Sequence, residues 1–134
     1  MIPAKVLIVE DERIVAQHLR QRLSLLGYQV PAIATTGPQA LEQINNFRPD
    51  LVLIDIHIEG EIDGIETCAR IPPALRIPVI YLTAYSEEAT LERARKTQPY
   101  GYLIKPFSER ELHATIQMAL ERRQADVLRA TASG

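Results

Sequence analysis

The apolar positions of the chain fall into five short runs separated by longer segments of mixed polarity. Three of the runs, at 5–10, 51–56 and 78–84, are nearly continuous rather than alternating. Such stretches are typical of parallel strands that are covered on both faces. Together with two further runs at 29–35 and 101–106, they predict five short strands.

Between the runs, apolar residues recur every three or four positions, as they do along one face of a helix. Val15, Leu19 and Leu23 give the first such face, and Gly27 stands where a C-terminal cap is expected. A capping box at Ser108 and Glu111 predicts the start of the last helix. The other helices are predicted to begin at Thr36-Gly37-Pro38 and to cover 64–70 and 86–96, and residues 122–134 are predicted to extend the last helix and to fray into a tail.

A strand followed by a helix, repeated five times, predicts an α/β fold with a doubly wound parallel sheet. Its crossovers are expected to be right-handed, with helices on both faces. The chain has 134 residues, of which 46% are apolar, enough to bury the core of one domain. We assign that domain to residues 1–121 and the remainder to the helical extension and tail.

Composition argues against several classes of protein. Lys and Arg total 15 against 17 for Asp and Glu, so there is no basic excess that would favour direct binding of nucleic acid. The single cysteine, Cys68, excludes an internal disulfide and a CxxC zinc site and fits a cytoplasmic location. No apolar run approaches the roughly 20 residues of a membrane span, and the acidic start of the chain differs from a signal peptide.

The residues with chemical potential stand at the predicted strand ends, where an open doubly wound sheet binds its ligands. They are Glu10 with Asp11, Asp55, Thr83 and Lys105. Each has an ordinary alternative: a helix cap, a structural salt bridge between Asp55 and Lys105, a strand threonine or a surface lysine. Those alternatives do not explain why all of them come to one edge, so we expect a binding site there.

The residue types indicate which ligand such a site would hold. Clustered carboxylates repel one another, and a divalent cation relieves that repulsion. All-oxygen ligands favour Mg²⁺, and the lack of a Cys/His cluster argues against zinc. The cation and the ammonium of Lys105 would attract a dianion, and Asp55 can act as a nucleophile. We therefore expect phosphoryl chemistry on or beside Asp55.

The same segments resemble the receiver domain of two-component response regulators, of the flavodoxin-like type seen in the bacterial chemotaxis regulator. They are VLIVEDE, LVLIDI followed by Asp63-Gly64, PVIYLTA and GYLIKPF, and the resemblance covers roughly residues 4–121. It implies a five-stranded parallel sheet in the order 2-1-3-4-5.

The resemblance also implies roles for the acidic residues. Asp55 matches the aspartate that accepts a phosphoryl group from the phosphohistidine of a sensor histidine kinase or a phosphotransfer protein. Asp11 matches a direct Mg²⁺ ligand, and Glu10 matches the neighbouring acid that holds the metal through water. The backbone carbonyl of His57 matches the third protein ligand.

The remaining roles concern switching. Thr83 matches the hydroxyl that bonds the phosphoryl group, and Lys105 matches the lysine that pairs with it. Lys105–Pro106 matches a cis peptide, and Tyr102 matches the aromatic that turns inward when the threonine moves. The implied result is a changed surface on the fourth helix, fifth strand and fifth helix, which an unknown output protein or module reads. Homodimerisation is left open.

Two features depart from the family pattern. The segment 55–64 is one residue longer than the common receiver loop, lacks its proline and adds Glu59 and Glu61. Tyr85 stands two positions after Thr83, where the family controls access of water to the phosphoryl group. We expect this bulky side chain to slow hydrolysis.

Two other functions compete with this interpretation. A phosphohydrolase of the haloacid dehalogenase type would need a second aspartate two residues after the nucleophile, where this chain has His57. A pseudo-receiver that binds without phosphorylation would lack a key residue, and none is missing. A separate protein and a piece of a larger one both remain open. His18 and His113 are interpreted as solvated or interface residues, Cys68 as a core residue, and Arg122, Arg123 and Arg129 as a solvated helix end.

Overall fold

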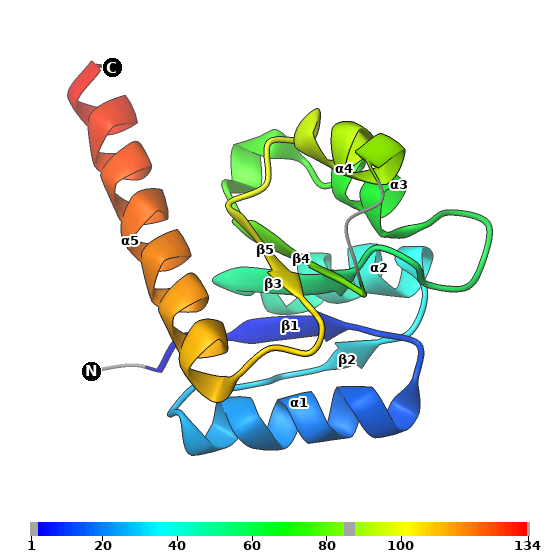
Figure 1. Cartoon of the computed structure of the whole chain (residues 1–134). Helices are drawn as coiled ribbons and strands as arrows, with labels where there is room; N and C mark the ends of the chain where they lie inside the picture. The colour runs from blue at the N-terminus through cyan, green and yellow to red at the C-terminus, as the bar shows by residue number, and fades with distance from the viewer. Residues whose placement is uncertain (1–2, 85–87, 134) are drawn as a thin grey trace.

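The computed structural model describes residues 3–84 and 88–133 and has the predicted α/β architecture (Figure 1). Five parallel strands form one sheet in the order β2-β1-β3-β4-β5, as the sequence predicts. Their bounds are β1 (Val6–Val9), β2 (Ile33–Ala34), β3 (Leu51–Asp55), β4 (Val79–Thr83) and β5 (Gly101–Ile104).

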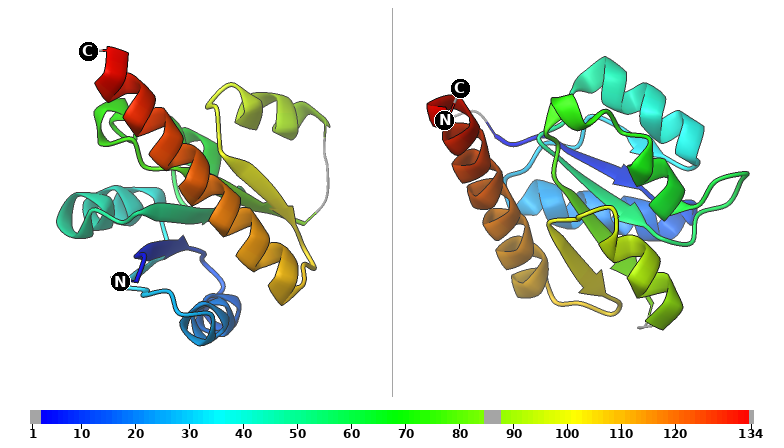
Figure 2. Two further views of the ribbon diagram at one scale, coloured as in Figure 1. Left: turned by 90° about the vertical axis from the view of Figure 1, so that its left-hand side faces the viewer. Right: turned by 90° about the horizontal axis from the view of Figure 1, so that it is seen from above.

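The helices alternate with the strands and cover both faces of the sheet (Figures 1 and 2). They are α1 (Arg13–Leu25), α2 (Gly37–Phe47), α3 (Gly64–Ala69), α4 (Glu88–Arg95) and α5 (Glu109–Ser133), with a short 3₁₀ turn, η1, at Pro73–Leu75. Apolar residues of α1 and α5 pack on one face, and those of α2, α3 and α4 pack on the other.

Alternate residues of the central strands divide between these two cores. Val6 and Ile8 face the layer of α1 and α5, whereas Leu7 and Val9 face the opposite layer. All four are fully buried. Burial on both faces explains why the central strands are nearly continuous apolar runs in the sequence.

The second strand is shorter than predicted. The sequence favours a strand over 29–35, but β2 pairs with β1 only at Ile33 and Ala34, and Gln29 forms an isolated bridge with Lys5. Pro31 stands between these two stretches and has no N–H to donate. Proline therefore interrupts the ladder at an edge strand, where such interruptions are tolerated.

The predicted helix caps are present. The side chain of Thr36 accepts a hydrogen bond from the Gln39 N–H, and Gly27 adopts a positive φ just after α1. Ser108 and Glu111 form the reciprocal bonds of a capping box at 3.0 and 3.3 Å. The caps at Thr36 and Ser108 fix the starts of α2 and α5, and Gly27 ends the chain reversal after α1.

The C-terminal part of α5 extends the last helix, and Arg122 and Arg129 are exposed on it. The helix continues to Ser133, and the guanidinium of Arg122 lies 4.4 Å from the centre of the Tyr100 ring. The Tyr100 hydroxyl donates to Asp126 at 2.8 Å, and Arg123 donates to the carbonyl of Arg76 at 2.9 Å. Arg129 is exposed and forms a 3.5 Å ion pair with Asp126 on its own helix. We call residues 122–131 the α5 extension; these contacts hold it against the body of the domain.

Candidate functional site

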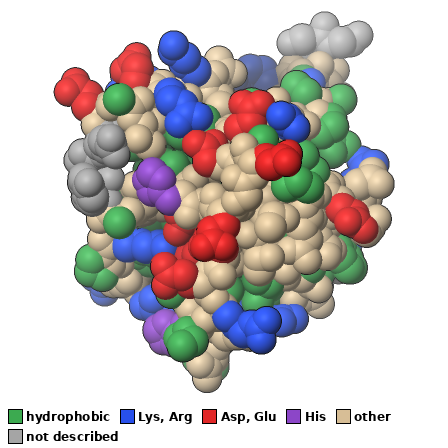
Figure 3. Space-filling model, turned by 90° about the vertical axis from the view of Figure 1, so that its right-hand side faces the viewer, with side chains coloured by type: hydrophobic (Ala, Val, Ile, Leu, Met, Phe, Trp, Pro, Cys, Tyr) green, Lys and Arg blue, Asp and Glu red, His purple; other side chains and the backbone are tan. Residues whose placement is uncertain are grey.

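The carboxyl ends of four strands bring the predicted site residues to one edge of the sheet. Glu10 directly follows β1, Asp55 and Thr83 end β3 and β4, and Lys105 directly follows β5. Parallel pairing aligns these ends, since Asp55 is level with Leu82 and Thr83 is level with Ile104. Figure 3 views the molecule from this edge and shows acidic side chains gathered near its centre, with a basic side chain beside them.

Lys105 joins two carboxylates that come from different strands. Its Nζ lies 2.6 Å from Asp55 Oδ2 and 2.9 Å from Glu10 Oε1. Glu10 is fully buried and Asp55 is 8% exposed. Buried carboxylates need partners, and one ammonium that serves both holds the two strand ends together through charge-assisted hydrogen bonds.

The electrostatics of Glu10 and Lys105 reflect this burial. Burial raises the pKa of Glu10, the hydrogen bond from Lys105 opposes that shift, and the charge of Asp55 adds to it. Burial alone would lower the pKa of Lys105, but its hydrogen bonds to Asp55 and Glu10 outweigh burial and raise it. The site therefore holds a firmly protonated lysine beside a carboxylate whose ionisation is costly.

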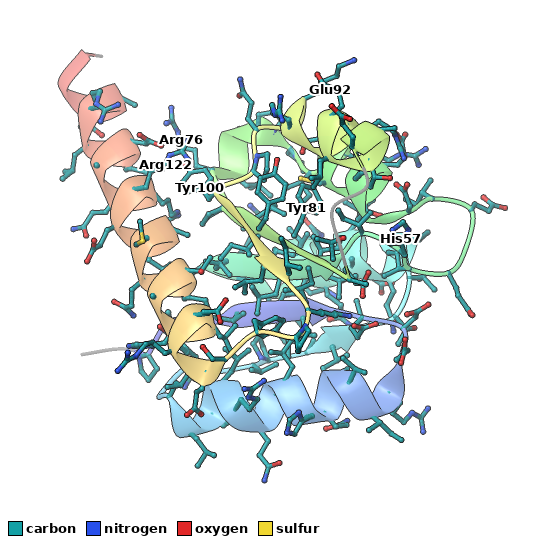
Figure 4. All side chains as sticks on the ribbon, viewed as in Figure 1. His57, Arg76, Tyr81, Glu92, Tyr100 and Arg122 are labelled. Carbon is teal, nitrogen blue, oxygen red and sulfur yellow. The ribbon has the colours of Figure 1, made fainter. Side chains whose placement is uncertain are left out.

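The β3–α3 connection positions the second oxygen of Asp55. Asp55 Oδ1 accepts a hydrogen bond from the His57 N–H at 2.8 Å. A Cβ at Gly64 would collide with the carbonyl oxygen of Asp55, and the Gly64 N–H donates to the carbonyl of Ile56 at 2.8 Å. Glycine at position 64 thus lets the start of α3 approach the backbone of the site. The His57 side chain is exposed on this loop (Figure 4).

Asp11 contacts the unusual loop. Its Oδ2 accepts a hydrogen bond from the Glu59 N–H at 3.0 Å, and Glu10 Oε2 accepts one from the Glu12 N–H at 3.3 Å. The side chains of Glu59 and Glu61 are exposed. The longer loop is therefore tied to the acidic edge by its backbone, while its two added acids face solvent.

The donor set fits Mg²⁺ by its chemistry. Among the described residues, no three His, Cys, Asp or Glu side chains converge as a ready-made metal centre. Magnesium does not need one, because it keeps several waters and takes only one or two carboxylates with other hard oxygens. Asp11, Asp55 and the His57 carbonyl offer such oxygens at this edge.

Thr83 and Lys105 are coupled through the backbone. The side chain of Thr83 is buried, and its carbonyl accepts a hydrogen bond from the Lys105 N–H at 2.7 Å. The Lys105–Pro106 peptide is cis, as predicted. Tyr102 is 38% exposed, and its ring centre lies 6.1 Å from that of Tyr81 on the neighbouring strand. Tyr85 lies outside the described residues.

Sequence reasoning missed two contacts behind the site. Asp63 caps α3 by accepting from the Glu66 N–H at 2.9 Å and also forms a 3.1 Å ion pair with Arg93 of α4. Tyr81 is fully buried and shares a 2.7 Å hydrogen bond with Thr97, and burial raises its pKa far above the usual range. The sequence predicts a helix over 64–70, but nothing local in it pairs Asp63 with Arg93 or Tyr81 with Thr97.

His18, His113 and Cys68, which were not predicted to take part in the site, lie outside it. His113 Nδ1 lies 3.0 Å from the hydroxyl of Tyr28, which also accepts a hydrogen bond from Gln117 at 2.7 Å. His18 is exposed, and Cys68 is partly buried. No helix within the described ranges is long and apolar enough to cross a membrane.

Comparisons with known proteins agree with this geometry. The response regulator receiver domain family model matches residues 6–117. The transcriptional regulatory protein PdtaR of Mycobacterium tuberculosis is 36% identical over 121 residues, which are 90% of this chain and 58% of PdtaR. The phosphate regulon transcriptional regulatory protein PhoB of Rhizobium meliloti is 37% identical over 131 residues, covering 96% of this chain and 56% of PhoB. The chain thus spans somewhat more than half the length of these curated relatives.

Solved structures show the same relationship. The signal receiver domain of a modulated diguanylate cyclase from Desulfovibrio desulfuricans G20 has a TM-score of 0.88 and 38% identity, covering 93% of this chain and 99% of that one. A CheY-like response regulator receiver domain protein from Methanospirillum hungatei JF-1 has a TM-score of 0.85 and 25% identity, with 93% and 99% covered. With its fold, its edge of acids and lysine, and these relatives, the chain belongs to the response regulator receiver domains of two-component systems, which are phosphoacceptor switches rather than turnover enzymes.

Proposed function

We propose that this chain accepts a phosphoryl group on Asp55 from the phosphohistidine of a sensor histidine kinase or phosphotransfer protein. The observation that carries the proposal is the position of Lys105, whose Nζ lies 2.6 Å from Asp55 Oδ2 and 2.9 Å from Glu10 Oε1. An ammonium so close to the Asp55 carboxylate is within reach of a phosphoryl oxygen added there. Phosphoryl transfer requires mainly positioning and neutralisation of charge.

The transfer is a displacement at phosphorus. A carboxylate oxygen of Asp55 forms the new O–P bond while the P–N bond to the donor imidazole breaks, and the imidazole leaves with the electron pair. Lys105 pairs with the negative charge of the phosphoryl group, and the hydroxyl of Thr83 donates to one of its oxygens. The His57 N–H, which bonds Asp55 Oδ1 at 2.8 Å, holds the carboxylate in orientation.

The acidic edge provides a place for Mg²⁺. Asp11, Asp55 and the carbonyl of His57 would hold the ion directly, and Glu10 would hold it through water. The bound ion supplies positive charge that offsets the oxygens of the entering phosphoryl group. The fully buried state of Glu10 and its raised pKa support this assignment, because an added cation relieves a costly buried carboxylate.

The switch acts through β4 and β5. Thr83 moves towards the phosphoryl group, and Tyr102, now 38% exposed beside Tyr81, turns inward. The surface of α4, β5 and α5 changes as a result, and an output protein or module reads it. The phosphoryl group biases an equilibrium that the unphosphorylated protein already samples.

The test is a phosphorylation assay with intact mass as its readout. The protein is incubated with acetyl phosphate and Mg²⁺, with and without EDTA, as wild type and as Asp55→Asn. We expect one hydroxylamine-labile phosphoryl adduct on the wild type, which is absent with EDTA and absent in Asp55→Asn.

Asp63→Asn is the matched control. It makes the same chemical change in the same connection, and asparagine still caps α3. This variant should be phosphorylated like the wild type. An adduct that persists in Asp55→Asn would place the acceptor elsewhere and contradict the proposal. Size-exclusion chromatography with beryllium fluoride then shows whether the activated form dimerises.

A further inference from the structure

A pocket of about 590 Å³ lies at the end of the sheet opposite to the acidic edge. It is bounded by the C-terminal ends of α3 and α4, by the first residue of β4, and by the α5 extension. Figure 4 shows Arg76, Tyr100 and Arg122 together between the C-terminal half of α5 and the body of the domain. This volume is in the range of small-molecule binding sites.

The charged side chains that line the pocket are mostly basic. Arg76, Lys96 and Arg123 are cations, and Asp126 is the acid among the lining residues. Asp126 already accepts a hydrogen bond from Tyr100 at 2.8 Å. Within the described residues, neither Arg76 nor Lys96 forms an ion pair. The lining of the pocket therefore carries more positive than negative charge.

Apolar side chains form part of the remaining wall. Ile71, Ile77, Val79 and Val127 line the pocket together with Pro72 and Pro73. Ile71 and Val79 belong to the core that α2, α3 and α4 cover. A ligand in this pocket would meet apolar surface on its body and cations at its head, which is the pattern of an amphipathic anion.

Two turns shape the backbone around the pocket. Arg76 and Gln98 both line it, and both have left-handed backbone conformations, with φ of 51° and 55°. Arg76 caps the C-terminal end of η1 in this way, and Gln98 follows α4. The conformation at Arg76 also presents its carbonyl to Arg123, which donates to it at 2.9 Å.

The α5 extension completes the pocket. It contributes Arg123, Asp126 and Val127, and it is held in place by Tyr100 and Arg76. If the extension moved away, the pocket would lose one wall and one of its cations. A ligand that requires this wall therefore stabilises the docked position of the extension.

We propose that this pocket binds a small organic anion, with an apolar body against the aliphatic wall and a carboxylate, sulfonate or phosphate head at Arg76 and Lys96. Its binding holds the α5 extension against the body of the domain. The site is thus a second input to α5, separate from Asp55. It rests on the pocket and its charges, so it stands independently of the proposed phosphorylation.

The test uses a pair of probes that differ in charge. Anilinonaphthalene sulfonate carries an aromatic body and a sulfonate, and phenylnaphthylamine has the same body without the charge. Cys68 is the single cysteine of the chain and lines the pocket, so its alkylation by neutral iodoacetamide reports occupancy by intact mass. We expect the anionic probe to slow alkylation at least about fivefold more than the neutral one.

Substitution of the two cations tests whether the anionic probe binds at Arg76 and Lys96. Arg76→Gln and Lys96→Gln, made separately, should each weaken binding of the anionic probe by about tenfold and leave the neutral probe unchanged. Arg110→Gln, an exposed arginine in the first turn of α5, is the matched control and should bind as the wild type does. Amide exchange over residues 122–131 should slow when the anionic probe is bound.

The whole test is carried out on Asp55→Asn protein without Mg²⁺ as well as on the wild type. Equal results in both separate this site from the phosphorylation chemistry. Three outcomes would overturn the proposal. They are equal protection of Cys68 by the two probes, anionic binding that leaves Cys68 alkylation unchanged, and binding that survives both Arg76→Gln and Lys96→Gln.

Discussion

The charged side chains at the two ends of the sheet differ in burial and in pairing. At the carboxyl ends, Lys105 lies between Glu10 and Asp55, and both carboxylates are buried. At the amino ends, Arg76 and Lys96 are exposed and form no ion pair within the part of the chain that the structure describes. Charge at the first end is therefore part of the energetics of the fold, whereas charge at the second end is available to a ligand.

The difference follows from which elements supply the charges. Strand ends are fixed by the pairing of the sheet, so side chains there are brought together and lose water whether or not they attract one another. Helix ends and turns leave their side chains room to reach solvent. Substitutions at the carboxyl end should therefore change stability, and those at the amino end should change it little.

The largest effect is expected at Gly64, where the backbone of α3 approaches the backbone of the site. A Cβ in Gly64→Ala would meet the carbonyl of Asp55, which cannot move away without disturbing β3. We expect a loss of about 3 kcal/mol in the free energy of unfolding, measured by urea denaturation. Gly101→Ala, at the opposite end of the sheet, meets the side chains of Thr115 at 3.2 Å and Ile80 at 3.9 Å and should cost clearly less. Equal losses would show that the close approach is not special to the site.

Lys105→Gln and Lys96→Gln compare the same change at the two ends. Lys105→Gln removes the common partner of two buried carboxylates, and we expect a loss of about 2 kcal/mol, reduced from a fully buried pair because Lys105 is 27% exposed. Lys96→Gln should change stability by less than about 0.5 kcal/mol. Thermal and urea unfolding at neutral pH without Mg²⁺ would measure both. If the two variants lost similar amounts of unfolding free energy, the proposed difference between the two ends would be wrong.

Glu10→Gln should raise stability. Since the pKa of Glu10 is raised mainly by burial, the folded protein binds a proton more tightly than the unfolded chain does. Between the ordinary pKa of 4.5 and the raised pKa, the contribution of Glu10 to stability therefore falls as pH rises. Glutamine mimics the neutral form, so Glu10→Gln should gain on the order of 1 kcal/mol at neutral pH without Mg²⁺ and lose that slope.

The same unfolding measurements, repeated with Mg²⁺, test whether the acidic edge binds the ion. If the acidic edge binds the ion, Mg²⁺ should stabilise the wild type more than Glu10→Gln, and the gap between them should narrow. If the stability of the wild type relative to Glu10→Gln does not fall with rising pH in that window, the assigned cause of the raised pKa is contradicted.

The carboxyl end could be predicted from the sequence because each of its residues follows a recognisable strand. Asp55 ends a continuous apolar run, and Lys105 and Thr83 follow two others, so a parallel sheet alone places them at one edge. What the sequence did not show is which atoms meet. The ion pair of Asp63 with Arg93 and the buried bond of Tyr81 with Thr97 join residues that are distant in the chain and have no shared pattern.

The amino end could not be predicted in the same way. Its pocket combines turn residues such as Arg76 with one face of the α5 extension. Arg76 has a φ of 51°, and the sequence gives no sign of this turn because the position is not a glycine. That extension carries arginines, which fit a solvated helix end equally well. Only the placement of Tyr100 shows that Arg122 and Asp126 are tied to the body.

Of these variants, Tyr100→Phe is expected to change the free energy of unfolding least. Its effect should be confined to the α5 extension. The change removes the hydroxyl that donates to Asp126 at 2.8 Å but keeps the ring on which Arg122 stacks. The loss in stability should be about 0.5 kcal/mol, because the bond is partly exposed and Asp126 regains water. Amide exchange should nevertheless speed up over residues 122–131 while β1 and β3 keep their protection. If exchange in the extension is unchanged, Tyr100 does not hold the wall of the pocket. If it rises throughout the sheet, the amino end is as much a part of the core as the acidic edge is.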